Sequence, residues 1–265
     1  EMADNFDSKA GKIIEGLTRT AAAVFCRNRL TVSVTAREED VREAERLLPG
    51  LLEGLPVSGS DRAAMRPVSP EHAPNEGFTN SGSVQYVAKG YDLSLLGHGY
   101  CGAMEVVATI ARLDYLWNRV RVQGGAYGAF IGFERDGRFY LGSFRDPNLE
   151  STLEAYDGLP DFLRALDPGE DELTKAILGT IAKLDRPLTP AMKGAVATER
   201  RLMGVTFADV QRVRNEVLAT GPKDVRRIAD VIRDALDRNL YCVIGNEERL
   251  TRSRSLFSRL EKLFK

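Results

Sequence analysis

The residues best suited to chemistry lie on either side of two consecutive glycines, Gly124 and Gly125. Arg121 carries a permanent positive charge with five N–H donors, and Tyr127 carries one phenolic O–H group. The glycine pair permits a sharp change of backbone direction, and Gly128 leaves little backbone bulk beside the tyrosine. A guanidinium and a phenol that converge across this turn could stabilise negative charge on a carbonyl oxygen. A purely structural interpretation, a tight helix-to-strand turn with a packed tyrosine, is equally open on these residues alone.

A second candidate is the glycine-rich run 97–102, which has the dinucleotide-binding pattern G-x-G-x-x-G and precedes a predicted helix. Backbone N–H groups at the start of a helix can hold a pyrophosphate. However, the segment before this run is not a clean strand, and no acidic residue ends a second parallel strand about 20 residues later. We therefore interpret the run as a helix-entry loop, with nucleotide binding as a minor alternative.

Histidine and cysteine are too scarce for a self-contained metal or nucleophile site. His98 and Cys101 are close in sequence, but a structural zinc needs four ligands, and His72 lies in a proline-rich stretch. No G-x-S-x-G motif occurs, and a serine or cysteine nucleophile would need one of the two histidines as its base. We expect no metal site and no stand-alone hydrolytic site in this chain.

The composition is that of a soluble, enzyme-sized protein of one large or two small domains. Of its 265 residues, 43% are hydrophobic and 28% charged, which excludes wholesale disorder. The 37 basic and 38 acidic residues give a net charge of −1, so no overall field recruits nucleic acid or an anionic membrane. The three cysteines indicate reduced thiols, and the N-terminus lacks the pattern of a signal peptide. We expect an intracellular protein, cytoplasmic if its source is bacterial, with no nucleic-acid or membrane partner.

The C-terminal segment 248–264 combines basic residues with an apolar pattern. Its apolar residues fall at helical spacing on one face, and we interpret it as a terminal helix packed on a sheet. The basic residues between them leave a nucleic-acid or membrane surface as a lesser alternative.

The elements that must position these residues come in unequal blocks. The hydrophobic pattern predicts a helix over 8–28, a strand over 30–36, a helix over 38–53, a long connector over 55–80 and a strand over 84–88.

A helix over 103–119 then precedes two strands, 126–134 and 138–145, which Asp136-Gly137 joins as a hairpin. Helices follow over 149–166, 170–184, 190–203, 206–219 and 223–238, and a strand over 240–244. This order predicts an α+β fold in which a mixed or antiparallel sheet of about five or six strands is packed by helices.

The sequence resembles the zinc metallopeptidases of the insulinase superfamily (peptidase family M16), specifically the presequence-protease branch. The likeness covers most of 25–245. It is carried by Leu116-Trp117, residues 121–128, residues 143–147 (Ser-Phe-Arg-Asp-Pro), residues 179–187, Lys193-Gly194 and residues 204–206.

The resemblance implies an M16-type α/β domain from a larger enzyme, in which two similar halves close like a clamshell around a chamber. In that family the N-terminal half carries an inverted zinc motif, H-x-x-E-H, which this sequence lacks. The chain therefore looks like the C-terminal portion of such a peptidase. On this view residues 1–28 are the helical end of the preceding domain, and residues 29–265 form the C-terminal domain.

What the resemblance implies for function falls on few residues. Arg121 and Tyr127 match the arginine and tyrosine that bind the scissile carbonyl and stabilise the tetrahedral intermediate, with Gly124 and Gly125 beside the substrate. The zinc would be bound by the missing N-terminal half of the polypeptide, or by a partner subunit, and the substrate would be an unfolded peptide. This portion alone should be inactive. The alternative is a non-catalytic scaffold or core-type subunit that assists a separate catalytic chain.

Overall fold

The computed structural model describes residues 6–57 and 74–263, and the chain divides into two compact units. The first unit combines Glu1–Ser69 with Pro187–Thr206, and the second combines Pro70–Arg186 with Phe207–Lys265. His72 and the middle of the predicted connector lie outside the described residues. Within the described ranges, no helix is both long and apolar enough to cross a lipid bilayer.

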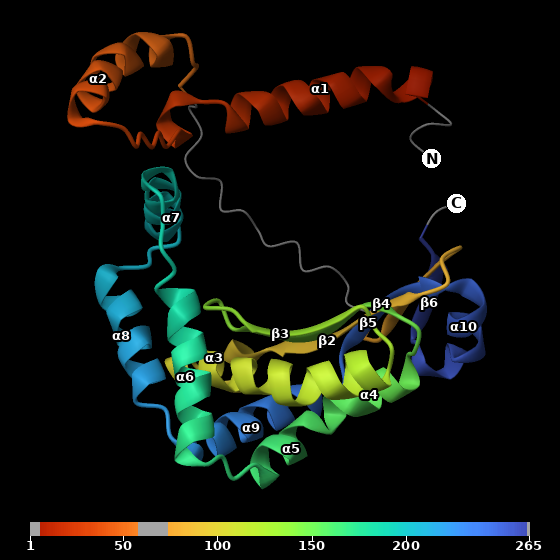
Figure 1. Cartoon of the computed structure of the whole chain (residues 1–265). Coiled ribbons are helices and arrows are strands. Elements are labelled where there is room, and N and C mark those ends of the chain that lie inside the picture. The colour runs from red at the N-terminus through yellow and green to blue at the C-terminus, as the bar shows by residue number, and fades with distance from the viewer. Residues whose placement is uncertain (1–5, 58–73, 264–265) are drawn as a thin grey trace. The chain divides into compact units, whose positions relative to one another are not determined.

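The second unit is built on a six-stranded mixed sheet with the strand order β3-β4-β2-β5-β1-β6 (Figure 1). Strand β1 runs parallel to β5 and β6, and the other neighbouring pairs are antiparallel. This confirms the predicted α+β class. The strands are β1 (Glu76–Asn80), β2 (Gln85–Asp92), β3 (Gly128–Phe133), β4 (Arg138–Asp146), β5 (Tyr241–Asn246) and β6 (Arg259–Lys262).

Some helices of the second unit pack directly against one face of this sheet, and the others pack on those helices (Figure 1). They bury one alternate set of strand side chains, which includes Val87, Leu141 and Val243. The helices are α3 (Gly102–Ile110), α4 (Glu150–Asp157), α5 (Leu159–Ala165), α6 (Glu170–Leu184), α8 (Phe207–Leu218), α9 (Pro222–Leu236) and α10 (Glu247–Arg252), with short 3₁₀ turns η3 (Leu93–Leu96) and η5 (Arg254–Leu256). Helix α3 continues without a break into a π-helical stretch, η4 (Ala111–Gln123).

An ion pair between a buried lysine and a half-exposed aspartate joins α4 to the sheet. Lys89 of β2 is 3% exposed, and its ammonium lies 2.6 Å from the Asp157 carboxylate and 2.9 Å from the Asn239 amide oxygen. These partners lie at the end of α4 and just before β5. Because a buried ammonium without partners is very unfavourable, this contact fixes three segments relative to one another.

In the described part of the chain, the first unit consists of helices and an extended segment. Its helices are α1 (Phe6–Val24), η2 (Arg27–Arg29), α2 (Glu38–Glu53) and α7 (Pro190–Leu202). The strand predicted over 30–36 is wrong as a paired strand, because the segment is extended but has no strand partner within the described residues. It crosses α7 instead, where Thr198 donates a 2.6 Å hydrogen bond to Ser33.

Several predicted boundaries are corrected by long-range pairing and by glycine. The predicted C-terminal helix over 248–264 is wrong beyond Arg252, because the chain turns there and pairs as β6 with β1. Strand β1 lies inside the predicted connector. The predicted helix over 149–166 is two helices that meet at Gly158, and the helix over 103–119 runs on to Gln123. The predicted helix over 8–28 ends at Val24.

The glycine-rich run has a packing role in the described structure. Gly97 has a φ of 80°, in the left-handed region, and ends η3. Gly102 begins α3 against α8, where a Cβ atom would lie 2.4 Å from the Val213 carbonyl oxygen and 2.7 Å from the Val217 nitrogen. Gly99, between them, has open space around it. The third glycine of the pattern is therefore required by the contact between two helices.

This contact predicts a clear difference between two alanine substitutions in the same loop. Gly102→Ala should lower the free energy of unfolding by about 1–3 kcal/mol, because backbone atoms of α8 would have to move. Gly99→Ala is the matched control and should change it by less than about 0.5 kcal/mol. Urea unfolding of the two variants measures both values, and equal stabilities would contradict the packing role.

Candidate functional site

Arg121 and Tyr127 are brought together by the way η4 ends. Gly125 has a φ of 80°, and the N–H of Ala126 donates a 3.1 Å hydrogen bond back to the Val120 carbonyl. A Cβ atom on Gly124 would lie only 2.5 Å from the same carbonyl oxygen. Both glycines are thus needed, one for its close approach and one for its left-handed backbone. The chain then reverses into β3.

The backbone of Tyr127 is fixed while its side chain is free. Its N–H lies 3.1 Å from the Phe144 carbonyl and 3.4 Å from the Arg145 carbonyl, both at the end of β4. The tyrosine side chain is 66% exposed, and its ring meets that of Phe144 edge-on at 6.0 Å between centroids. The phenol is therefore presented to solvent from a rigid backbone.

The Arg121 guanidinium is held by aromatic rings. Its Cζ lies 4.0 Å from the centroid of Trp117, one helical turn earlier, and 6.0 Å from the centroid of Tyr127. Within the described residues it makes no ion pair, so its N–H donors are not taken up by a carboxylate. A cation held over a ring keeps its charge and its outward donors. The guanidinium and the phenol ring thus lie near each other at the glycine turn, while the roles expected of them remain a prediction.

Side chains behind the turn hold it in place. Asp146, fully buried, accepts hydrogen bonds from the Asn148 N–H and the Thr152 hydroxyl, each at 2.8 Å. The Asn148 amide in turn donates to the Gly124 carbonyl. These bonds join the end of the hairpin to the helix that follows it. Unlike the buried Asp146, the neighbouring Arg145 has an exposed side chain. Its backbone φ of 49° lies in the left-handed region.

One nearby phenol has an altered acidity. Burial, with help from the neighbouring Glu134 carboxylate, raises the pKa of Tyr140, which donates a hydrogen bond to that carboxylate. Both effects disfavour the charged phenolate form of Tyr140.

The sequence alone did not indicate that Trp117 and Phe144 would contact the site residues. The four-residue spacing of Trp117 and Arg121 could have indicated the first contact, because such pairs share a helix face. The second contact depends on the pairing of β3 with β4, which places Phe144 opposite Gly128. Local sequence contains no signal for that register beyond the hairpin turn.

The described residues do not form a metal site. They contain no cluster of three or more histidine, cysteine, aspartate or glutamate side chains suited to a metal ion. His98 bonds Asp234 at 3.0 Å, and Cys101 lies 3.8 Å from the Arg227 guanidinium. The two residues that are close in sequence therefore contact different partners.

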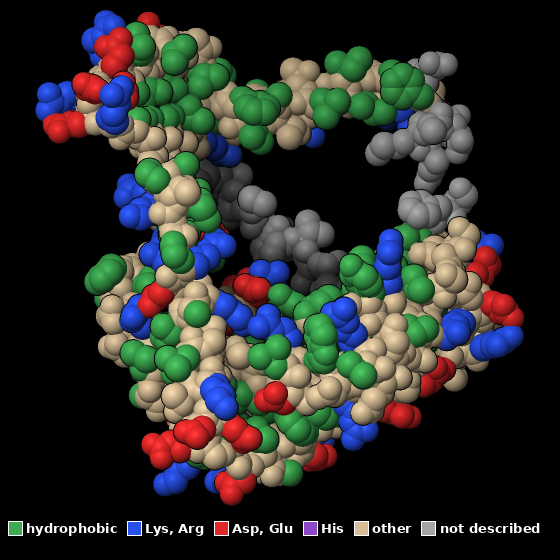
Figure 2. All heavy atoms as spheres, in the orientation of Figure 1, with side chains coloured by type: hydrophobic (Ala, Val, Ile, Leu, Met, Phe, Trp, Pro, Cys, Tyr) green, Lys and Arg blue, Asp and Glu red, His purple; other side chains and the backbone are tan. Residues whose placement is uncertain are grey.

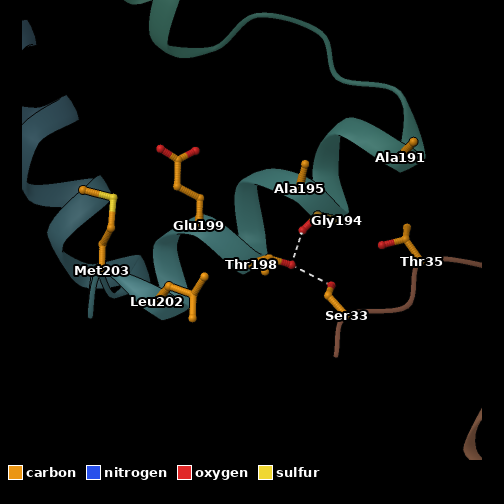
Figure 3. Close-up of a pocket in the computed structure, with 9 residues that line it drawn as sticks. All are labelled: Ser33, Thr35, Ala191, Gly194, Ala195, Thr198, Glu199, Leu202 and Met203. Atoms are coloured by element: carbon orange, nitrogen blue, oxygen red, sulfur yellow. Dashed lines mark hydrogen bonds between the residues drawn. The ribbon is translucent and has the colours of Figure 1, made fainter. Parts of the chain in front are cut away.

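A hollow of about 710 Å³ lies in the first unit, where the extended segment crosses α7 (Figure 3). Small and hydroxyl side chains line it, including Ser33, Thr35 and Thr198, and Glu199 is its one ionisable lining residue. Figure 3 shows Thr198 bonded to Ser33 and to the Gly194 carbonyl. Among these lining residues no nucleophile is paired with a base, so they lack the groups for hydrolytic chemistry.

Sequence comparison finds relatives that are much longer than this chain. The chain is 35% identical to the protein HypA of Clostridium perfringens over 98% of its own length, and 34% identical to presequence protease 1 of Arabidopsis thaliana over 89%. It spans only 26% and 22% of those two proteins. The chain thus corresponds to about a quarter of the length of these relatives.

Solved structures show the same fold at low sequence identity. A protease from Helicobacter pylori matches with a TM-score of 0.54 and 13% identity, over 80% of this chain and 53% of that one. An inactive M16 peptidase domain from Pseudomonas fluorescens matches with a TM-score of 0.52 and 14% identity, over 80% of this chain and 51% of that one. The family model of the presequence protease (PreP) C-terminal domain matches residues 75–245. Because that match covers more than half of the sequence, this chain belongs to the presequence protease C-terminal domain family of the M16 peptidases.

Proposed function

We propose that this chain is the zinc-free C-terminal part of a metalloendopeptidase that degrades unfolded peptides in a closable chamber. In this proposal Arg121 and Tyr127 donate hydrogen bonds to the scissile carbonyl of the peptide, and Gly124 and Gly125 lie beside it. The N-terminal half of the same polypeptide, or a partner subunit, would hold the zinc and the general base. Residues 1–28 would be the helical end of the preceding domain, and residues 29–265 the C-terminal domain.

The observation that carries the proposal is that a guanidinium and an exposed phenol ring lie near each other at a turn with a fixed backbone. The Arg121 Cζ lies 6.0 Å from the centroid of the Tyr127 ring, and the tyrosine is 66% exposed. A residue that only filled the turn would be packed, and the backbone bonds to β4 already hold the turn without the phenol. An exposed phenol beside a guanidinium without an ion-pair partner in the described chain is suited to bind an oxygen that gains negative charge.

The π-helical stretch that supplies Arg121 supports the same interpretation. Long π-helical stretches are rare, and π-bulges occur frequently at functional sites because they shift side chains relative to a regular helix. Here η4 ends at the residue before Gly124, so the wider helix sets the direction in which Arg121 points.

The first test is Tyr127→Phe in the longer enzyme that contains the zinc-binding half. Loss of one hydrogen-bond donor to the developing oxyanion should lower kcat about 10²–10³-fold, with a much smaller change in KM. The matched control is Tyr91→Phe, which removes a phenol from the opposite end of the β2–β4 pair and should leave kcat unchanged. Steady-state cleavage of an unstructured fluorogenic peptide measures both variants. Unchanged turnover in Tyr127→Phe would show that the assignment is wrong.

A second test asks which half of the enzyme binds the zinc. The 265-residue chain alone should take up no zinc at concentrations that saturate a structural zinc site, whose apparent binding free energy is about 10–16 kcal/mol. It should also leave the fluorogenic peptide intact. Calorimetric titration of the chelator-treated chain with Zn²⁺ measures the first property. Tight binding of one Zn²⁺ per chain would contradict the proposal that the metal belongs to the other half.

A further inference from the structure

The face of the sheet opposite the helices carries a group of aromatic side chains, of which four are exposed and Tyr86 is half-buried. We call this the aromatic face and define it by Tyr86, Tyr127, Phe130, Tyr140 and Phe144. Phe130 is 44% exposed and Phe144 41%, on strands whose alternate side chains are turned toward the helices. Soluble domains rarely leave a continuous apolar surface uncovered, and such surfaces commonly bind a ligand or partner.

Glycines on the paired strand make room for the rings to lie against the sheet. Phe130 is opposite Gly142, and Tyr140 is opposite Gly132. A Cβ atom on Gly142 would lie 2.1 Å from the Phe130 ring, and one on Gly132 would lie 2.4 Å from the Tyr140 ring. The rings of Phe130 and Tyr140 therefore lie over the glycines of the neighbouring strand, with 6.3 Å between their centroids.

The aromatic face continues into the candidate site. The rings of Tyr86 and Phe144 are 5.3 Å apart, and those of Phe144 and Tyr127 are 6.0 Å apart. Alternate side chains of an extended peptide are about 6.6–6.8 Å apart on one face. Neighbouring rings are thus spaced closely enough to contact successive apolar side chains of an extended peptide.

The end of the aromatic face near Tyr127 is positively charged. The Arg145 guanidinium lies 5.7 Å from the Phe144 centroid, and neither it nor Arg121 pairs with a carboxylate in the described parts of the chain. In Figure 2, basic and hydrophobic side chains lie next to one another along the edge of the second unit that carries β3 and β4. A ligand that complements this surface combines apolar side chains with a carboxylate.

We propose that the aromatic face binds an extended, unfolded peptide that has large apolar side chains at alternate positions and a carboxylate beside Arg145. This inference rests on the proposed function, because it assigns a binding surface to the peptide whose carbonyl Tyr127 would contact. The peptide class is defined by its side chains, and apart from Tyr127 the residues that would bind it do not touch the reacting carbonyl.

The test measures binding of fluorescein-labelled synthetic peptides to the full 265-residue chain by anisotropy. One peptide alternates Phe with Ser and ends in a free carboxylate, a second has Ser in place of every Phe, and a third is the first with its C-terminus amidated. The first should bind at least about tenfold more tightly than the second, because each buried Phe ring contributes strongly to affinity. The third should bind less tightly than the first.

Two variants and one control assign that binding to the surface. Phe144→Ser should weaken binding of the first peptide about tenfold, and Tyr86→Ser serves as a second variant if Phe144→Ser fails to fold. Phe207→Ser is the matched control, because Phe207 is a 79% exposed phenylalanine on α8. It should leave the affinity unchanged. Arg145→Gln should remove the preference for the free carboxylate over the amide.

Three outcomes would overturn the inference. The first is equal affinity of Phe144→Ser, Tyr86→Ser and the unmodified chain. The second is equal affinity for the Phe and Ser peptides. The third is a dimer, detected by sedimentation, that Phe144→Ser abolishes, since the surface would then join two copies of the chain.

These outcomes are separate from failure of the proposed function. They are measured as binding to the 265-residue chain, whereas the catalytic role of Tyr127 is measured as turnover of the longer enzyme. Unchanged turnover in Tyr127→Phe together with weakened binding in Phe144→Ser would reject the catalytic role and retain the binding surface.

Discussion

The hydrogen bond from the Tyr127 N–H to the end of β4 is the constraint on which the candidate site depends. It joins the last residue of the turn to the strand that pairs with β3, and so ties the end of η4 to the sheet. Arg121 lies six residues before Tyr127 on η4, and the Trp117 ring holds its guanidinium 6.0 Å from the centroid of the phenol ring. The two side chains need no direct bond to each other to remain close. This leaves their donors available to a ligand.

The one-sided packing of the sheet explains why the same strands have two roles. Helices bury one set of alternate side chains, and the ion pair of Lys89 with Asp157 holds them in place. The other set faces away from the helices and is less buried than the first. Aromatic rings and glycines on that side could therefore be selected for binding, since exposed positions tolerate substitution at little cost in stability.

Local patterns predicted those elements whose partners are close in sequence. Asp136-Gly137 predicted the β3–β4 hairpin, and Gly137 indeed has a positive φ of 100°. The helix predicted for the C-terminal segment was wrong, although its apolar residues fit a helical pattern. Leu260 instead pairs with Gly77, which is far away in the chain. The extended conformation of residues 30–36 was predictable from alternation, but the lack of a partner strand among the described residues was not. For the site, the glycine pair indicated the turn, while the ring contact of Tyr127 with Phe144 required the strand register.

The extended segment of the first unit has a consequence for the protein in solution. Leu30, Val32 and Val34 are all between 42% and 49% exposed, and their backbone has no strand neighbour within the described residues. A bare edge with alternating aliphatic side chains is a template on which another polypeptide can add as a strand. A lysine in place of one of these aliphatic residues would therefore oppose self-association of the protein through this segment.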